Sequence, residues 1–237
     1  MIIFLQATVE GLSLAAIYSL VAIGFVLIYK AMEVLSFAQP ALAVVGAGII
    51  SSLAVDRGIP FWLALFLGVI LTGILGLLIE RTFLRPMVGE PVFSVAVLTI
   101  GIDILLRTVL DSWIGINPKY MGDPFPSYGN FGAIKLGGVN IKYLELAALI
   151  TAILLIILLT IFFRKSKYGI AMRATSYDQE AAMAQGINVG RIFGLVWMIA
   201  GILAAFAGFF ITGGFNTLSQ FSLSLIHISE PTRPYWI

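Results

Sequence analysis

Charged residues are scarce in this chain of 237 residues: Asp, Glu, Lys and Arg make up 11% of it, and the formal net charge is only +2. Soluble domains carry about 25% charged residues. Hydrophobic residues instead make up 60% of the chain, and its mean hydropathy is +1.04. This composition excludes a soluble enzyme, a nucleic-acid-binding protein and a disordered segment, and it predicts a polytopic protein of the lipid bilayer.

Cysteine is absent, and His227 is the only histidine. The lack of cysteine excludes disulfides, thiolate metal ligands and a cysteine nucleophile. One histidine leaves little for zinc binding or for acid–base catalysis. Because the usual nucleophile–base pairs are missing, we expect no enzyme, no catalytic residue, no metal site and no cofactor. The N-terminus also lacks the basic region of a secretory signal, so its first apolar stretch is expected to remain as a span.

Long apolar runs are abundant. A hydrocarbon core about 30 Å thick needs about 20 helical residues for each crossing. Backbone groups in lipid must be satisfied within their own segment, so unbroken runs of this length favour helices over barrel strands. We therefore expect an all-α polytopic membrane protein with about six transmembrane helices, at residues 11–29, 34–55, 58–79, 92–114, 143–163 and 192–213.

The basic residues favour one orientation. With the N-terminus outside, eight Lys and Arg residues of the links fall on the cytoplasmic side and four fall outside. Cytoplasmic loops carry the excess of Lys and Arg, so an external N-terminus is expected. The cytoplasmic set is Lys30, Arg81, Arg85, Arg164, Lys165, Lys167, Arg173 and Arg191, and the external set is Arg57, Lys119, Lys135 and Lys142.

The link at 115–142, expected outside, contains a Gly-Gly pair between two short alternating segments at 134–141. Glycine tolerates the positive φ angles that a two-residue hairpin turn requires. We therefore predict a small external β-hairpin, which serves either as an ordered cap over the helix ends or as a docking surface.

The second long link, 164–191, is expected in the cytoplasm and to contain a short helix. Ser176 and Gln179 have the spacing of a capping box, so the helix should start at Tyr177. Gly186 is a suitable residue to end it, and the residues between are strong helix formers. The prediction is a cytoplasmic helix of two to three turns.

Glu180, Ala181, Ala182 and Gly186 form the pattern E-A-A-x-x-x-G in this link. The pattern resembles the EAA loop of prokaryotic ABC-importer permeases. Across roughly residues 5–220, the chain is similar to the branched-chain amino-acid permease family of the LivH type. The supporting segments are ERTFLRP at 80–86, KSKYG at 165–169 and RA at 173–174.

This resemblance implies that Glu180, Ala181, Ala182 and Gly186 form an ATPase-coupling loop, although an incidental interfacial helix is the alternative. The implied partners are cytoplasmic ATP-binding subunits, a second permease subunit and an extracytoplasmic solute-binding protein. The implied activity is import of a small amino-acid-like solute, branched-chain amino acids above all, across a bacterial or archaeal plasma membrane by alternating access. A permease for urea or short amides is one alternative, and a stand-alone secondary transporter is another of a different class.

Polar residues within the spans are candidates for the translocation path. The family commonly has Asn-Phe-Ala-His-Gly at the start of its second span, and residues 36–40 here are SFAQP. The resemblance therefore implicates Phe37 and Gln39. Asp103 and Arg107, four residues apart, share one helix face. They either line the solute path or neutralise each other as a packing pair.

Two other features are expected to be structural. Glu80, Arg81 and Arg85 lie at the end of the third span, where they would anchor the helix at the interface or contact the ATPase. Ala204 and Gly208 are small residues spaced for close helix packing.

Residues 223–237 resemble the in-frame translation of a sequencing adapter, so we expect a non-native tail that includes His227. Residues 1–222 would then be an incomplete permease domain, because the family pattern has about eight spans.

Overall fold

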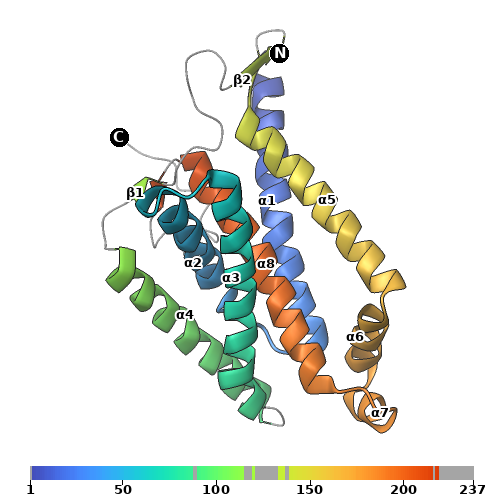
Figure 1. Cartoon of the computed structure of the whole chain (residues 1–237). Helices are drawn as coiled ribbons and strands as arrows, with labels where there is room; N and C mark the ends of the chain where they lie inside the picture. The colour runs from blue at the N-terminus through green and yellow to red at the C-terminus, as the bar shows by residue number, and fades with distance from the viewer. Residues whose placement is uncertain are drawn as a thin grey trace.

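The computed structural model describes residues 2–87, 90–114, 119–120, 133–136, 139–215 and 217–218. Within these residues, six helices are long and apolar enough to cross a membrane, which confirms the all-α polytopic fold. They lie side by side, while two short helices follow α5 at one end (Figure 1). The spans are α1 (Ile2–Met32), α2 (Gln39–Ser51), α3 (Phe61–Ile79), α4 (Val92–Ile114), α5 (Tyr143–Lys165) and α8 (Val189–Phe215), and the short helices are α6 (Lys167–Tyr177) and α7 (Gln179–Ala184).

The start of α1 lies further toward the N-terminus than expected, at Ile2 instead of residue 11. The side chain of Gln6 provides a reason. Its Nε2 donates to the carbonyl of Asn140 at 2.9 Å, and its Oε1 accepts from the Asn140 amide at 2.8 Å. These two bonds dock the extra turns of α1 against strand β3 (Val139–Lys142).

The second span starts later than expected, at Gln39 instead of residue 34. Pro40 lies in the first turn of α2. In a helix begun at residue 34 this proline would be internal, where it removes a backbone hydrogen bond and clashes with the preceding turn. The span is completed at its other end by a π-helical turn, Ser52–Asp56. Similarly, α3 continues through a π-helical turn, Glu80–Leu84, and a 3₁₀ turn, Arg85–Met87.

The centre of the fold is α8, which packs against α1, α2 and α3. Small residues make the contact close: a Cβ atom at Gly208 would collide with the backbone of Ala43 on α2, and one at Gly76 would collide with the carbonyl of Trp197. Ala204 is fully buried in the same seam. The predicted packing role of Ala204 and Gly208 is confirmed, since small residues let helix backbones approach.

The predicted hairpin is present. Strand β2 (Ala133–Leu136) pairs antiparallel with β3, with Leu136 opposite Val139 and Ala133 opposite Lys142. The Gly-Gly pair between the strands lies outside the described residues. A second short antiparallel pair joins β1 (Lys119–Tyr120) to β4 (Thr217–Leu218).

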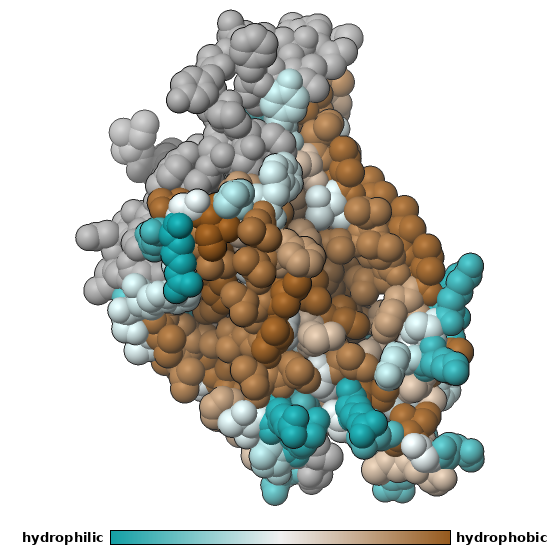
Figure 2. All heavy atoms as spheres, in the orientation of Figure 1, coloured by the Kyte–Doolittle hydropathy of each residue, from teal (hydrophilic) through white to brown (hydrophobic). Residues whose placement is uncertain are grey.

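On the face seen in Figure 2, the coloured surface is mostly apolar, and many of its hydrophilic residues lie at the end that carries α6 and α7. The large exposed apolar side chains include Phe66, Ile104 and Ile157. Successive spans alternate in direction, so the two predicted sets of cations belong to opposite ends of the molecule. Residues 223–237, the expected non-native tail, lie outside the described residues.

Candidate functional site

The predicted second span, 34–55, is not helical at its start; the non-helical segment between α1 and α2, residues 33–38, is called the break in the second span. Residues 33–38 leave the helix, yet Ser36 and Ala38 are buried. The backbone amide of Phe37 donates to Oγ1 of Thr99 on α4 at 3.1 Å. Non-helical backbone at membrane depth is tolerated only where protein or a water-filled cavity surrounds it. The burial of this break therefore makes it the first candidate site.

Gln39 opens α2 from a fully buried position. Its Nε2 donates to the carbonyl of Ala200 on α8 at 3.0 Å, and Gly24 of α1 leaves the space that its amide occupies. Its Oε1 is buried without a hydrogen-bond partner among the described residues, as is Oγ of Ser36. A buried polar group left unpaired costs about 1–3 kcal/mol. These two oxygens are therefore available to accept hydrogen bonds from a solute or from water.

Asp103 and Arg107 form the expected pair on α4. Nε of Arg107 donates to Oδ2 of Asp103 at 3.0 Å, and each side chain is 18% exposed. Within the part of the chain that the structure describes, Oδ1 of Asp103 is buried without a hydrogen-bond partner. Because Thr99 lies four residues before Asp103, the pair shares the α4 face that binds the amide of Phe37.

The four predicted path residues lie in two places around the start of α2: Phe37, Asp103 and Arg107 on the side of α4, and Gln39 on the side of α8. The backbone of Phe37 contacts the α4 face that carries Asp103 and Arg107. The side chain of Gln39 instead contacts α8. Since α2 packs against both α4 and α8, the start of this helix connects the two groups.

The second candidate site is α7. Its N-cap is Asp178, whose Oδ1 accepts from the amide of Ala181 at 2.9 Å. The predicted start at Tyr177 with a capping box from Ser176 is wrong, because both residues belong to the last turn of α6. The helix has six residues instead of two to three turns. Asp178, with extended backbone, separates the two helices.

The predicted end of this helix is confirmed. Gly186 has a φ angle of +81°, a left-handed conformation that glycine adopts without strain. Its amide donates to the carbonyl of Met183 at 2.9 Å, and the amide of Ile187 donates to the carbonyl of Ala182 at 3.0 Å. This pair of bonds is the Schellman motif, which satisfies the last carbonyls of a helix.

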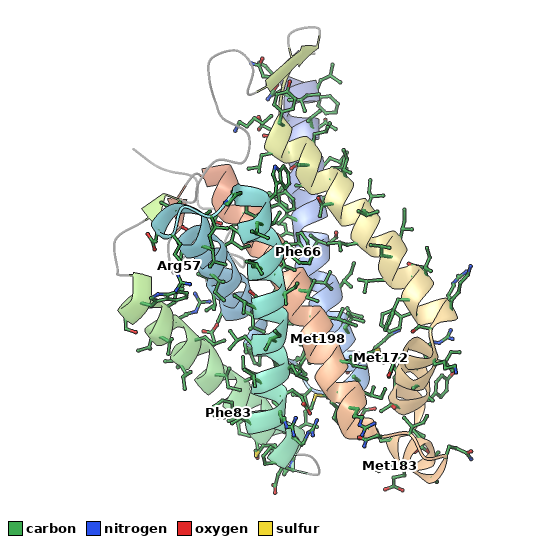
Figure 3. All side chains as sticks on the ribbon, viewed as in Figure 1. Arg57, Phe66, Phe83, Met172, Met183 and Met198 are labelled. Carbon is green, nitrogen blue, oxygen red and sulfur yellow. The ribbon has the colours of Figure 1, made fainter. Side chains whose placement is uncertain are left out.

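The residues of the predicted coupling loop do not all face the same way. Glu180, Ala181 and Gly186 are exposed, whereas Ala182 is buried within the chain. Met183 is exposed on α7, at the end of the molecule away from Arg57 (Figure 3).

Sequence reasoning missed two features next to α7. The side chain of Tyr177, at the end of α6, is 96% exposed. Helix α6 itself begins at Ser166, whose Oγ accepts from the amide of Gly169 at 2.8 Å. A serine at this position is a typical N-cap, so the sequence did contain a signal for the start of α6. The signal was missed because the neighbouring basic residues were interpreted only as membrane anchors.

Glu80 has a different position from the one expected of an interfacial anchor. Its carboxylate is fully buried, and Arg85 binds it through Nε at 3.3 Å and through Nη2 at 3.2 Å. Nη2 of Arg85 also donates to the carbonyl of Gly190 at 2.8 Å. The π-helical turn places residues 80 and 85 on the same side of the helix. Arg85 can therefore bind Glu80 and Gly190 together, which connects the end of α3 to the start of α8, close to α7. Arg81 is exposed, as an anchor would be.

Comparison with known proteins identifies relatives over nearly the whole chain. Residues 7–228 match the family described as branched-chain amino acid transport system / permease component. The chain is 28% identical over 212 residues to the high-affinity branched-chain amino acid transport system permease protein BraD of Pseudomonas aeruginosa, covering 86% of this chain and 69% of that relative. It is 27% identical over 213 residues to the corresponding protein LivH of Escherichia coli, with the same coverage of 86% and 69%.

A further relative comes from an archaeon. The probable branched-chain amino acid transport permease protein LivH of Methanocaldococcus jannaschii is 29% identical over 234 residues, covering 91% of this chain and 74% of the relative. No solved structure matches the chain. With a family match over residues 7–228 and six apolar helices, this chain belongs to the family of branched-chain amino acid permease components and is a multi-pass membrane protein.

Proposed function

We propose that this chain is a membrane-spanning subunit of an ATP-driven importer that carries branched-chain amino acids into the cytoplasm by alternating access. The names of its relatives support the class of solute. The observation that carries the proposal is α7, a helix capped at both ends that exposes Glu180 and Ala181. Its place beside the basic ends of α1, α3 and α5 suits contact with cytoplasmic ATP-binding subunits.

The other partners follow from the two ends of the molecule. With an external N-terminus, the end of the molecule that carries the eight predicted cytoplasmic Lys and Arg residues lies at the cytoplasmic leaflet of the plasma membrane. This agrees with the usual excess of Lys and Arg on that side. The hairpin of β2 and β3 would then lie outside, where a solute-binding protein docks. A second permease subunit would complete the importer, and ATP hydrolysis would belong to the ATP-binding subunits.

The contacts of α8 supply a mechanical connection between the two candidate sites. Asn188 caps the start of α8 through Oδ1, which accepts from the amide of Arg191 at 3.0 Å. Further along, the carbonyl of Ala200 holds Gln39 at the start of α2. We infer that displacement of α7 by the ATP-binding subunits tilts α8 and reshapes the break in the second span.

The break would receive the solute. Three buried oxygens have no hydrogen-bond partner in the described ranges: Oγ of Ser36, Oε1 of Gln39 and Oδ1 of Asp103. An ammonium group donates three hydrogen bonds and accepts none, so acceptors of this kind suit the amino group of an amino acid. In this proposal Arg107 holds Asp103 in place through its bond to Oδ2 while the solute passes.

Two substitutions on α7 test the function, Glu180→Lys and Gly186→Pro, in an importer reconstituted with its ATP-binding subunits and partner permease. The first reverses an exposed charge. The second removes the amide that donates to Met183 and cannot adopt a φ of +81°. We expect both variants to insert normally and to hydrolyse ATP, with amino-acid uptake reduced at least about tenfold, which corresponds to about 1.4 kcal/mol of coupling.

Glu90→Lys is the matched control, because Glu90 is also an exposed acid but lies outside α7. It should leave uptake unchanged. Full uptake by either α7 variant would overturn the coupling role. Uptake by the chain without ATP-binding subunits would instead identify a secondary transporter.

A further inference from the structure

A pocket of about 450 Å³ opens between α1, α5 and α6, and none of its lining residues belongs to the break in the second span or to α7. Met172 of α6 lies in this space between α1 and α5 (Figure 3). The volume falls within the range of about 300–1,000 Å³ that is typical of ligand pockets. The pocket therefore has room for part of a lipid-sized ligand.

Three cations line the pocket: Lys30 in the last turn of α1, Arg164 in the last turn of α5, and Arg173 on α6. All three side chains are exposed, and none has a hydrogen bond or ion pair within the part of the chain that the structure describes. No Asp or Glu is among the described residues that line the pocket. Such a cluster attracts an anion, and the guanidinium groups of Arg suit phosphate above all.

The remaining wall of the pocket is mostly apolar, with Thr160 and Ser176 as its polar residues. Leucine, isoleucine, valine and phenylalanine side chains continue from the cations toward the middle of the spans, and they include Ile23, Leu27, Leu159, Phe163 and Val196. A free phosphate ion would gain nothing from this wall. A zwitterionic lipid would bring its own cation against Lys30, Arg164 and Arg173. Of these three ligands, only an anionic phospholipid combines a net negative headgroup with an acyl chain.

We propose that this pocket binds an anionic phospholipid, with its phosphate on Lys30, Arg164 and Arg173 and an acyl chain along α1 and α5. Basic pockets between transmembrane helices are general sites for such headgroups. The occupied pocket would fix α5 and α6 against α1. Since α6 leads directly into α7 through Asp178, the lipid would also set the position of α7. The inference depends on neither the solute nor the partners proposed above.

The test uses the full chain in nanodiscs that contain phosphatidylglycerol, phosphatidylethanolamine or phosphatidylcholine. Native mass spectrometry after transfer to detergent reports the lipid that stays bound. We expect selective retention of phosphatidylglycerol and a higher thermal midpoint in its presence. The double variant Lys30→Gln/Arg173→Gln should bind it about 30-fold more weakly, since each cation near the membrane surface contributes about fivefold.

Two further variants separate the contributions. Thr160→Trp fills the apolar wall from an exposed position without changing charge, and it should also reduce retention. Arg191→Gln removes an exposed cation outside the pocket and should leave retention unchanged.

Three results would overturn the proposal. Equal retention of phosphatidylethanolamine would remove the selectivity for anions. The same thermal shift from millimolar inorganic phosphate alone would identify a free-phosphate site. A dimer that dissociates in the double variant would mean that a second copy of the chain covers this face.

Discussion

Helices α2 and α5 both cross the fold, but they occupy opposite environments. In the most apolar part of α2, 78% of residues are buried, compared with 11% in α5. Yet α5 is the most apolar of the six spans and α2 the least. Lipid tails are as apolar as leucine, so apolar side chains gain little by leaving lipid for another helix. Small residues such as Gly46 and polar residues such as Gln39 therefore determine which helix lies inside.

The largest effect is expected from Gly208→Leu, which would break the inner packing. Its side chain would collide with the backbone of Ala43, which cannot move as a flexible side chain would. Overpacking costs about 1–3 kcal/mol and more where the neighbour is rigid, so we expect no folded protein. The measure is the yield of monodisperse protein in detergent. Gly101→Leu on α4 is the control, because a Cβ there meets open space.

A matched pair of leucines comes next. Leu203→Ala on α8 removes a buried side chain, 1% exposed, and should lower the free energy of unfolding by about 2–5 kcal/mol. Leu158→Ala on α5 removes a side chain that is 52% exposed and should change it by less than about 0.5 kcal/mol, since lipid fills the space. Unfolding in graded sodium dodecyl sulfate measures both. Equal losses would contradict the distinction between inner and outer spans.

A smaller loss in the free energy of unfolding is expected from Arg85→Gln. This variant tests whether the end of α3 belongs to the packed interior or to the membrane surface. The substitution leaves the fully buried Glu80 without its partner. Loss of a buried pair is strongly destabilising. Because Arg85 is 41% exposed, water moderates the loss to about 1–3 kcal/mol. The double variant Glu80→Gln/Arg85→Gln should recover most of this stability in the same unfolding assay. A single variant as stable as the parent would place Glu80 in contact with water.

Much of the fold could be predicted because the signals were local. Residues 92–114 were predicted as a span and form α4 with those bounds. The hairpin followed from two glycines between alternating segments. Gly186 ends α7 as predicted because its backbone conformation depends only on its neighbours in the chain.

The errors involve competition between local signals or contacts between distant segments. Ser176 was predicted to cap the helix, but Asp178 caps it, because α6, capped by Ser166, continues through Ser176. Glu80 was expected at the interface because nothing local revealed the covering start of α8. The proposed path residues Phe37, Gln39, Asp103 and Arg107 were identified by residue type and resemblance, but not by their mutual arrangement.

The sequence by itself determined that this protein lies in a membrane, how many helices cross it, and where α7 ends. Those properties depend on the length of apolar runs and on the conformational freedom of single residues. Only the tertiary structure decided that α2 and α8 lie inside while α5 is largely exposed. It also brought together, around one pocket, three cations that have no ion pair among the described residues. In lipid, hydropathy does not distinguish a buried helix face from an exposed one, so small-residue contacts between distant segments make that choice.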